Sequence, residues 1–219
     1  MAENAPTTKN QPQGLRSRQK IERQADILAA AIAVMSEKGY HGTRISDIAE
    51  RAGVAYGLVY HYFGSKQNIL SYILESLWDR FGKRIQKISA QPGLSTAQKL
   101  TEISDYMLDT LIARPDIIRL LVQEIVRARH LETLPNIEIA RRIIQMIENI
   151  FKEGIRNGEL PADADPRLLS IVFFGSIEMV LTSLSTGIFS PVRKPDSRQI
   201  KSIKRKMRAF INGGSFGPK

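Results

Sequence analysis

Apolar side chains recur at three- and four-residue intervals along most of the chain, the spacing that places them on one face of an α-helix. The first run predicts a helix that ends near Lys38, before Gly39. Its expected buried face is Ile21, Ala25, Leu28, Ile32 and Met35. Glycine, proline or polar turns bound the later runs, which predict helices over residues 44–52, 55–62, 65–90, 95–113, 116–130, 134–157, 167–185 and 198–211. Because no stretch has a strand pattern, the expected fold is all-α.

Residues 43–66 (TRISDIAERAGVAYGLVYHYFGSK) contain two of these helices in close succession. Thr43 precedes the first helix, where its hydroxyl can accept a hydrogen bond from an unpaired N–H of the first turn. Gly53 ends that helix, because glycine takes the left-handed backbone of a tight turn without steric cost. Val54 and Val59 are the expected inward anchors of the second helix. The arrangement predicts a helix-turn-helix, whose second helix enters the major groove of DNA.

The stretch from Gly39 to Lys66 resembles the DNA-binding domain of the TetR family of bacterial transcriptional regulators. The matching residues are Gly39-Tyr40, Thr43, Ile45, Ile48-Ala49, Ala52-Gly53-Val54, Gly57, Val59-Tyr60-His61-Tyr62-Phe63 and Ser65-Lys66. Leu58 is the sharpest departure, since the family more often carries a small or polar residue there. The resemblance implies a three-helix DNA-binding domain followed by a helical effector-binding and dimerisation domain. It also implies a homodimer that a small hydrophobic ligand releases from a palindromic operator in double-stranded DNA.

The second helix of the motif should present one side to the DNA. Its expected outward residues are Ala55, Tyr56, Gly57, Tyr60 and His61. Tyr56 and His61 can hydrogen-bond base edges or phosphates, and Ala55 or Leu58 can contact a thymine methyl group. The family resemblance implies contacts with the DNA backbone from Thr43, Tyr60, Tyr62 and Lys66. Tyr62 also falls at an inward-packing position.

The formal charge of +10 suggests a polyanionic partner, but its distribution qualifies that inference. Residues 193–219 contain nine Lys or Arg and one Asp, so most of the excess lies outside the DNA-binding motif. Near the motif, Arg44 is a candidate phosphate or minor-groove contact. An arm carrying Arg16 and Arg18 can reach the same targets or simply be solvated. For the basic helix over residues 198–211, packing with a solvated back is favoured over a membrane-surface or DNA-contacting role.

By resemblance to the family, the helices that follow the motif enclose a ligand pocket. Candidate pocket residues are Trp78, Phe81, Tyr106, Met107, Arg119, Phe174 and Glu178. For each aromatic or Met side chain taken individually, core packing is the favoured interpretation, whereas Glu178 is an acid inside an apolar run, where burial without a partner is costly. Residues 154–160 (GIRNGEL) and the later FFGSIEMVLTSL look similar to the fatty-acid-degradation repressors that respond to long-chain acyl-CoA. A multidrug-responsive efflux regulator of the same fold is the alternative.

The family resemblance also implies that a four-helix bundle holds the dimer, with two long helices from each subunit. The sequence fits this expectation, because residues 137–151 and 168–184 are too apolar to be left exposed. The expected interface residues are Ile143, Ile147, Phe151, Ile171, Gly175, Val180 and Leu181.

Other classes of protein have little support in the sequence. His41, His61 and His130 show no metal-ligand spacing and no phosphate-binding glycine loop is present, so we expect neither an enzyme nor a metal or cofactor site. Zero cysteines, no N-terminal secretory signal and no run of about 18 uncharged apolar residues favour a cytoplasmic protein without stable membrane association. An alternative of a different class is a membrane-surface module that uses the basic C-terminal helix. The expected organisation is a disordered tail (1–14), a helix-turn-helix domain (15–63), an effector and dimerisation domain (64–190) and a basic loop and helix (191–219).

Overall fold

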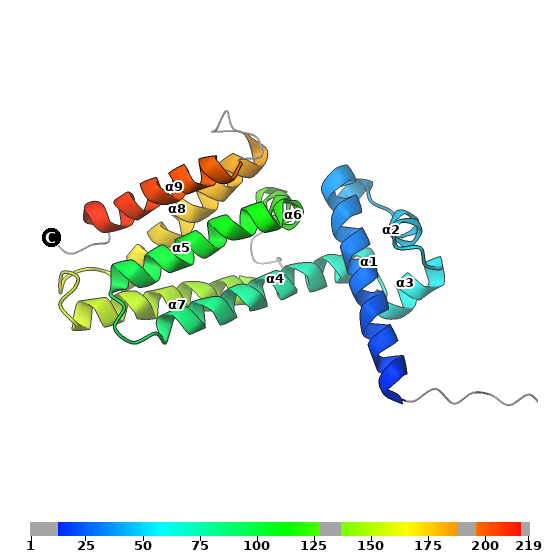
Figure 1. The fold of residues 1–219 in the computed structure, drawn as a ribbon, viewed down its shortest axis with the longest axis horizontal. Helices are drawn as coiled ribbons and strands as arrows, with labels where there is room; N and C mark the ends of the chain where they lie inside the picture. The colour runs from blue at the N-terminus through cyan, green and yellow to red at the C-terminus, as the bar shows by residue number, and fades with distance from the viewer. Residues whose placement is uncertain (1–12, 128–136, 188–195, 216–219) are drawn as a thin grey trace, which may run out of the picture. The chain divides into compact units, whose positions relative to one another are not determined.

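The computed structural model describes residues 13–127, 137–187 and 196–215, and every regular element in these ranges is helical (Figure 1). The elements are α1 (Gln13–Gly42), α2 (Ile45–Ala52), α3 (Tyr56–Phe63), α4 (Lys66–Ser89), α5 (Thr96–Ala113), α6 (Pro115–Arg127), α7 (Ile137–Arg156), α8 (Pro166–Thr186), α9 (Ser197–Phe210) and a short π-helical turn, η2 (Ile211–Ser215). The all-α prediction is confirmed. Most of the tail predicted to be disordered lies outside the described residues.

Two compact units divide the chain, residues 1–69 and 70–219. This division falls after the predicted one, because the first turn of α4 belongs with the first unit, where Ile69 is fully buried. Helix α9, from the region predicted as a basic loop and helix, belongs to the second unit and packs on α5.

The predicted buried face of the first helix is correct only in its C-terminal half. Ile32 and Met35 are buried, but Ile21 is 65% exposed and Ala25 is exposed as well. The reason is length: α2 and α3 have 8 residues each, whereas α1 has 30, so the two short helices can cover only part of it. Buried positions along α1 begin at Ile27.

Side-chain caps fix where several helices of the second unit begin. The Ser95 hydroxyl accepts a hydrogen bond from the Gln98 N–H at 3.3 Å, and the Gln98 side chain accepts one from the Ser95 N–H at 2.8 Å. Asp165 accepts bonds from two N–H groups of the first turn of α8, and Asp196 does the same for α9. These are the polar residues that precede the apolar runs in the sequence.

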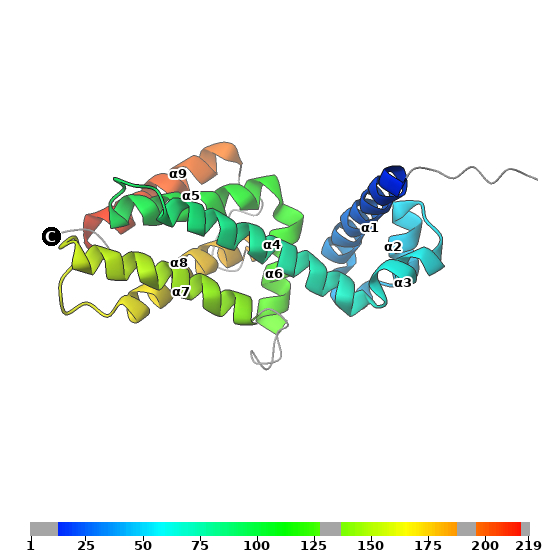
Figure 2. The same cartoon turned by 90° about the horizontal axis from the view of Figure 1, so that it is seen from below.

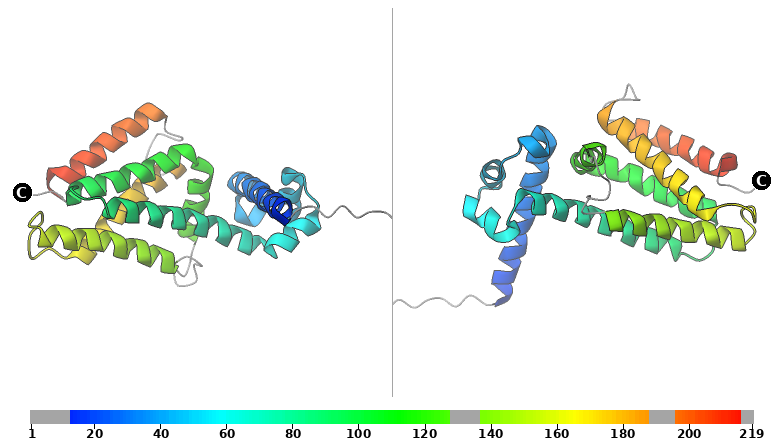
Figure 3. Two further views of the ribbon diagram at one scale, coloured as in Figure 1. Left: turned by 60° about the horizontal axis from the view of Figure 1, so that its bottom comes forward. Right: turned by 180° about the vertical axis from the view of Figure 1, so that it is seen from behind.

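Helix α5 lies at the centre of the second unit, where it contacts α6, α7, α8 and α9. Figures 1 and 2 show α9 on one side of α5 and α7 on the other. Helices α7 and α8 form a closely packed pair, with the rings of Phe151 and Phe173 6.4 Å apart, and Figure 3 shows this pair from two further directions.

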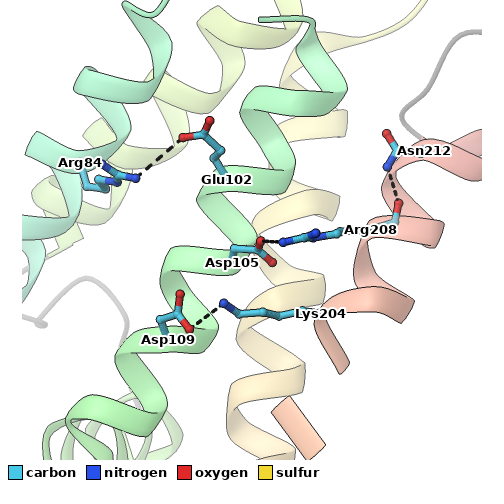
Figure 4. Close-up of polar contacts among 7 residues, drawn as sticks. All are labelled: Arg84, Glu102, Asp105, Asp109, Lys204, Arg208 and Asn212. Carbon is cyan, nitrogen blue, oxygen red and sulfur yellow. Dashed lines mark hydrogen bonds and ion pairs between the residues drawn. The ribbon is translucent and has the colours of Figure 1, made fainter. Parts of the chain in front are cut away.

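The basic helix α9 attaches to α5 through both apolar and charged contacts. Ile200 and Met207 are buried, while Lys204 pairs with Asp109 at 2.6 Å and Arg208 pairs with Asp105 (Figure 4). The hydrogen bond with Asp105 also raises the pKa of Arg208. A packing role for this helix therefore has direct structural support.

Candidate DNA-binding and effector sites

One side of α3 is exposed in the manner that a DNA-reading helix requires. Val59 is fully buried and anchors the helix, whereas Tyr56 and Tyr60 are 52% and 45% exposed. The other predicted outward residues, Ala55, Gly57 and His61, are exposed too. A Cβ added at Gly57 would meet no atom within 4 Å, so this glycine leaves an open notch in the surface. The notch lets the helix backbone come close to a partner.

The tight turn before α3 has the predicted form. Gly53 takes the left-handed conformation (φ 65°, ψ 33°), and the Val54 N–H donates to the Ala49 carbonyl at 3.0 Å. Residues 53–55 form this turn, between the end of α2 at Ala52 and the start of α3 at Tyr56. We call α2 and α3 the reader.

Tyr56 and Tyr60 form a pair on the exposed side of the reader, with ring centroids 5.1 Å apart. A hydrogen bond with Tyr60 raises the pKa of Tyr56. Tyr62 is half-buried, with its ring 6.5 Å from that of Phe63, in line with an inward-packing position. Leu58, the departure from the family pattern, is also half-buried.

The predicted capping role of Thr43 is wrong. Its side chain is only 2% exposed, and its hydroxyl donates to the Gly39 carbonyl at 2.8 Å. Arg44 takes the N-cap position of α2, and its N–H donates to the Asp47 carboxylate at 2.9 Å. This backbone hydrogen bond, together with Lys38, lowers the pKa of Asp47. A hydroxyl bonded in this way does not cap α2, whereas the contact of Thr43 with the DNA backbone stays a prediction.

Several cations of the first unit face solvent. Arg44 is exposed, and its guanidinium group has no ion-pair partner among the described residues. Arg18, Lys20 and Arg23 lie on the exposed N-terminal half of α1; the Arg16 side chain lies outside the described residues. The first unit thus has cations available for phosphate next to the reader and along α1.

Lys66 is placed differently from these cations. Its ammonium group donates to the carbonyl oxygens of Tyr40 and Thr43, both at 2.8 Å, and lies 4.4 Å from the centre of the Tyr40 ring. The residue pattern carries no signal for the two carbonyl partners, since every residue type has a backbone carbonyl.

The predicted pocket residues of the second unit come together, but mainly as a packed aromatic cluster. The Trp78 ring lies 6.3 Å from both Phe81 and Phe174, and the Phe81 ring lies 5.5 Å from Tyr106. Trp78, Phe81, Phe174 and Met107 are buried, and Arg119 is half-buried. Most of the set is therefore core, as the alternative interpretation held.

An open cleft of about 260 Å³ adjoins this cluster. It is lined by Leu77, Arg80, Tyr106, Asp109, Thr110, Ala113, Arg114 and Ile117. Of the predicted pocket residues only Tyr106 lines this cleft, and the prediction did not include Arg80 or Arg114. Arg80 is one residue from Phe81 and two from Trp78, and residues so spaced do not share a helix face, so the local pattern carries no signal for it.

Glu178 is the exception within the apolar run of α8. It is half-buried, and burial raises its pKa above the ordinary value for glutamate. No ion-pair partner for it exists among the described residues. In the sequence, Arg127, Arg129 and His130 are candidates either for a solvated helix end, the favoured interpretation, or for neutralising a ligand phosphate, but their side chains lie outside the described residues.

The segment over residues 154–160 has a structural explanation. A Cβ at Gly154 would lie 2.2 Å from the Thr96 hydroxyl oxygen, so only glycine permits this approach of α7 to α5. The Glu159 carboxylate accepts the Thr96 N–H at 2.5 Å, and the buried Lys99 pairs with Glu153 at 2.9 Å. The segment joins the C-terminal end of α7 to the start of α5 and does not line the cleft.

Four of the predicted interface residues are buried within the single chain. Ile143, Ile147, Phe151 and Leu181 pack inside the second unit and are unavailable to a partner. The prediction is wrong for these residues because apolar periodicity cannot distinguish a face covered by the same chain from one covered by a second chain. Ile171 is 48% exposed, and Gly175 and Val180 are partly exposed.

Ile171 belongs to an exposed apolar stripe along α8, with Leu168, Val172, Gly175 and Met179. By length and composition alone α8 could cross a membrane, but the core helix of a soluble protein passes the same test, so this is weak evidence. Arg167 and Glu178 lie within α8, so the helix contains no run of about 18 uncharged residues, as predicted.

Comparison with known proteins settles the family. Residues 27–73 match the bacterial regulatory proteins of the tetR family, and residues 97–203 match the tetracyclin repressor-like C-terminal domain. The chain belongs to the tetR family. Members of this family are DNA-binding transcriptional regulators that act as dimers on operator DNA.

Relatives within the tetR family include a regulator of fatty acid metabolism and a transcriptional repressor. The fatty acid metabolism regulator protein of Bacillus subtilis is 30% identical over 167 residues, which cover 76% of this chain and 85% of that protein. The structure of FadR from Bacillus subtilis in complex with stearoyl-CoA superposes with a TM-score of 0.74 at 26% identity, covering 87% of this chain and 98% of that one. The repressor KstR2 of Mycolicibacterium smegmatis is 26% identical over 169 residues, 75% of this chain and 77% of its own length.

Proposed function

We propose that the protein is a dimeric transcriptional repressor, not an enzyme, and that a long-chain acyl-CoA releases it from a palindromic operator in the cytoplasm. The observation that carries the proposal is the likeness to FadR of Bacillus subtilis, whose structure contains stearoyl-CoA and matches this chain over 98% of its own length. The fatty acid metabolism regulator of the same organism supports it by sequence, at 30% identity.

The chemistry of the second unit suits such an effector. An acyl-CoA joins a long apolar chain to several phosphate groups, and the cleft offers apolar side chains, such as Leu77 and Ile117, beside the guanidinium groups of Arg80 and Arg114. Guanidinium groups bind phosphate through charge-assisted hydrogen bonds. Tyr106 lines the cleft, and its ring contacts Phe81 of the buried aromatic cluster. The cleft with its arginines therefore lies next to the apolar core of the second unit.

Glu178 favours a second candidate, a multidrug-responsive efflux regulator of the same fold. A half-buried carboxylate without a cationic partner among the described residues would gain one from a cationic drug. Binding of this kind would lower the pKa of Glu178, which burial raises in the free protein.

The proposed dimer interface is the stripe of Leu168, Ile171, Val172, Gly175 and Met179 on α8. Their spacing of three or four residues places them on one helix face, and four of them are large apolar side chains that are about half exposed. A second copy is the partner that would cover such a face, because α7 and α8 from two subunits make a four-helix bundle.

A thermal-shift screen with stearoyl-CoA, CoA, stearate and a cationic drug tests the proposed effector. A ligand that binds only the native state must raise its melting temperature. Stabilisation by stearoyl-CoA well beyond that by CoA or stearate is the expected result. Stabilisation by the drug alone would replace the acyl-CoA proposal with the efflux-regulator candidate.

A further inference from the structure

The first turn of α4 is hydrogen-bonded to both ends of the reader. Lys66 donates to the carbonyl oxygens of Tyr40 and Thr43, in the turn that enters α2. Asn68 donates from its side-chain amide to the Phe63 carbonyl at 2.9 Å, at the exit of α3. The start of α4 therefore holds the entrance and the exit of the reader together.

The turn that Lys66 binds has little freedom of its own. Gly39 breaks the helical backbone with φ 72° and ψ 163°, and Thr43 closes the loop by donating its hydroxyl to the Gly39 carbonyl at 2.8 Å. Carbonyl oxygens at the end of a helix carry partial negative charge, which an ammonium group neutralises. The Tyr40 ring, 4.4 Å from the same ammonium group, adds a cation–π contact.

We propose that Lys66 is a positioning residue for operator binding: it fastens the α1–α2 turn to the first turn of α4 and so sets how the reader is presented to DNA, instead of neutralising a phosphate itself. Two of its three N–H donors are directed to backbone carbonyls of the protein. Arg44 provides the contrast, because it is exposed and has no ion-pair partner among the described residues.

The two roles differ in their dependence on salt. Each phosphate that a protein neutralises adds about 0.9 to the slope of the logarithm of affinity against the logarithm of salt concentration. Removing one phosphate-neutralising cation from each subunit of a dimer therefore lowers the slope by about 1.8. A lysine that acts through the protein's own carbonyls contributes affinity but leaves the slope unchanged.

The experiment measures operator affinity across a salt series for the full-length wild type, Lys66→Met, Lys66→Gln and Arg44→Met, on a duplex selected from random sequences. Methionine keeps the length of the side chain without a donor, and glutamine restores a neutral amide that can donate to carbonyls. We expect Lys66→Met to bind about tenfold more weakly or worse, because it removes both charge-assisted hydrogen bonds, and to keep the wild-type slope. We expect Lys66→Gln to recover part of that affinity, and Arg44→Met to lower the slope.

A slope lowered equally by Lys66→Met and Lys66→Gln, without recovery by glutamine, would overturn the proposal and make Lys66 a phosphate contact. Wild-type affinity in Lys66→Met would overturn it as well. Circular dichroism melts establish that each variant is folded at the temperature of the binding measurement. If Lys66→Met does not fold, the comparison of Lys66→Gln with Arg44→Met still decides the matter through the slope.

Discussion

The two units of the protein differ in how exposed their candidate functional residues are and in how far apart these residues lie along the chain. In the first unit, the residues expected to meet DNA on α3 are exposed and lie within a single stretch of chain. In the second unit, the residues expected to meet a ligand are mostly buried in an aromatic cluster, and the open cleft beside them is formed by α4, α5 and α6 together. A site on one short helix follows from local spacing, whereas a site between helices depends on how the helices pack.

The largest expected effect is on the packing of the second unit, and Gly154→Ala tests it. The new Cβ would collide with Thr96, a buried and short side chain, so we expect a loss of about 1–3 kcal/mol in the free energy of unfolding. Urea denaturation measures this loss. Gly82→Ala is the matched control, because a Cβ there finds only the end of Met146 at 3.9 Å. If Gly154→Ala and Gly82→Ala changed the free energy of unfolding by the same amount, the result would contradict the close approach of α7 to α5.

The next largest effect is expected on dimer formation, through the exposed apolar residues of α8. Ile171→Glu should convert the dimer to monomer, because an interface would bury an unpaired carboxylate. Sedimentation velocity measures the change. Ile112→Glu, at an apolar residue of α5 that is 40% exposed, is the control and should leave the dimer intact. A stable Ile171→Glu dimer would mean that the stripe on α8 is not the interface.

A smaller effect concerns the reader and leaves the fold unchanged. Gly57→Ala should not destabilise the protein, because the added methyl group meets no atom within 4 Å and alanine favours the helix. Operator affinity should nevertheless fall about tenfold, the equivalent of one base-edge interaction, as the methyl group keeps α3 from the groove. Fluorescence anisotropy with labelled operator would measure it. Undiminished affinity would show that Gly57 does not face the DNA.

The smallest effect is the pH dependence associated with Glu178. Burial raises its pKa in the folded state above the unfolded value, so the folded protein holds the proton more tightly. Stability from this group is therefore greatest below the unfolded pKa of about 4.3 and falls as the pH rises through the folded value. Glu178→Gln should remove this decline and be more stable than wild type at neutral pH, as measured by thermal melts across the pH range. An unchanged pH profile would indicate that the carboxylate has a cationic partner.

Much of the fold could be predicted from sequence because the apolar spacing and the helix-ending residues are local. Gly53 and Val59 are examples, since their roles depend only on neighbours a few residues away. Thr43 was misassigned because its hydroxyl donates backwards to Gly39, a bond that competes with capping and leaves no trace in the residue pattern.

The remaining misassignments have a common cause. Ile147 and Ile171 occupy similar positions in apolar runs, yet the first is fully buried and the second is 48% exposed. Their difference arises from the packing of α7 against α8, which periodicity does not encode. Arg80 and Arg114 were missed for the same reason, since these two arginines come to line one cleft only where α4, α5 and α6 meet.

The central claim is that an acyl-CoA bound by the second unit controls the reader. The most direct measurement is the fraction of operator bound by the full-length dimer as stearoyl-CoA is titrated, with CoA and stearate in parallel. We predict release of the operator by stearoyl-CoA at concentrations where neither CoA nor stearate has an effect, because a ligand shifts an equilibrium only through different affinities for its two states. Operator binding that persists when stearoyl-CoA saturates the protein would contradict the account.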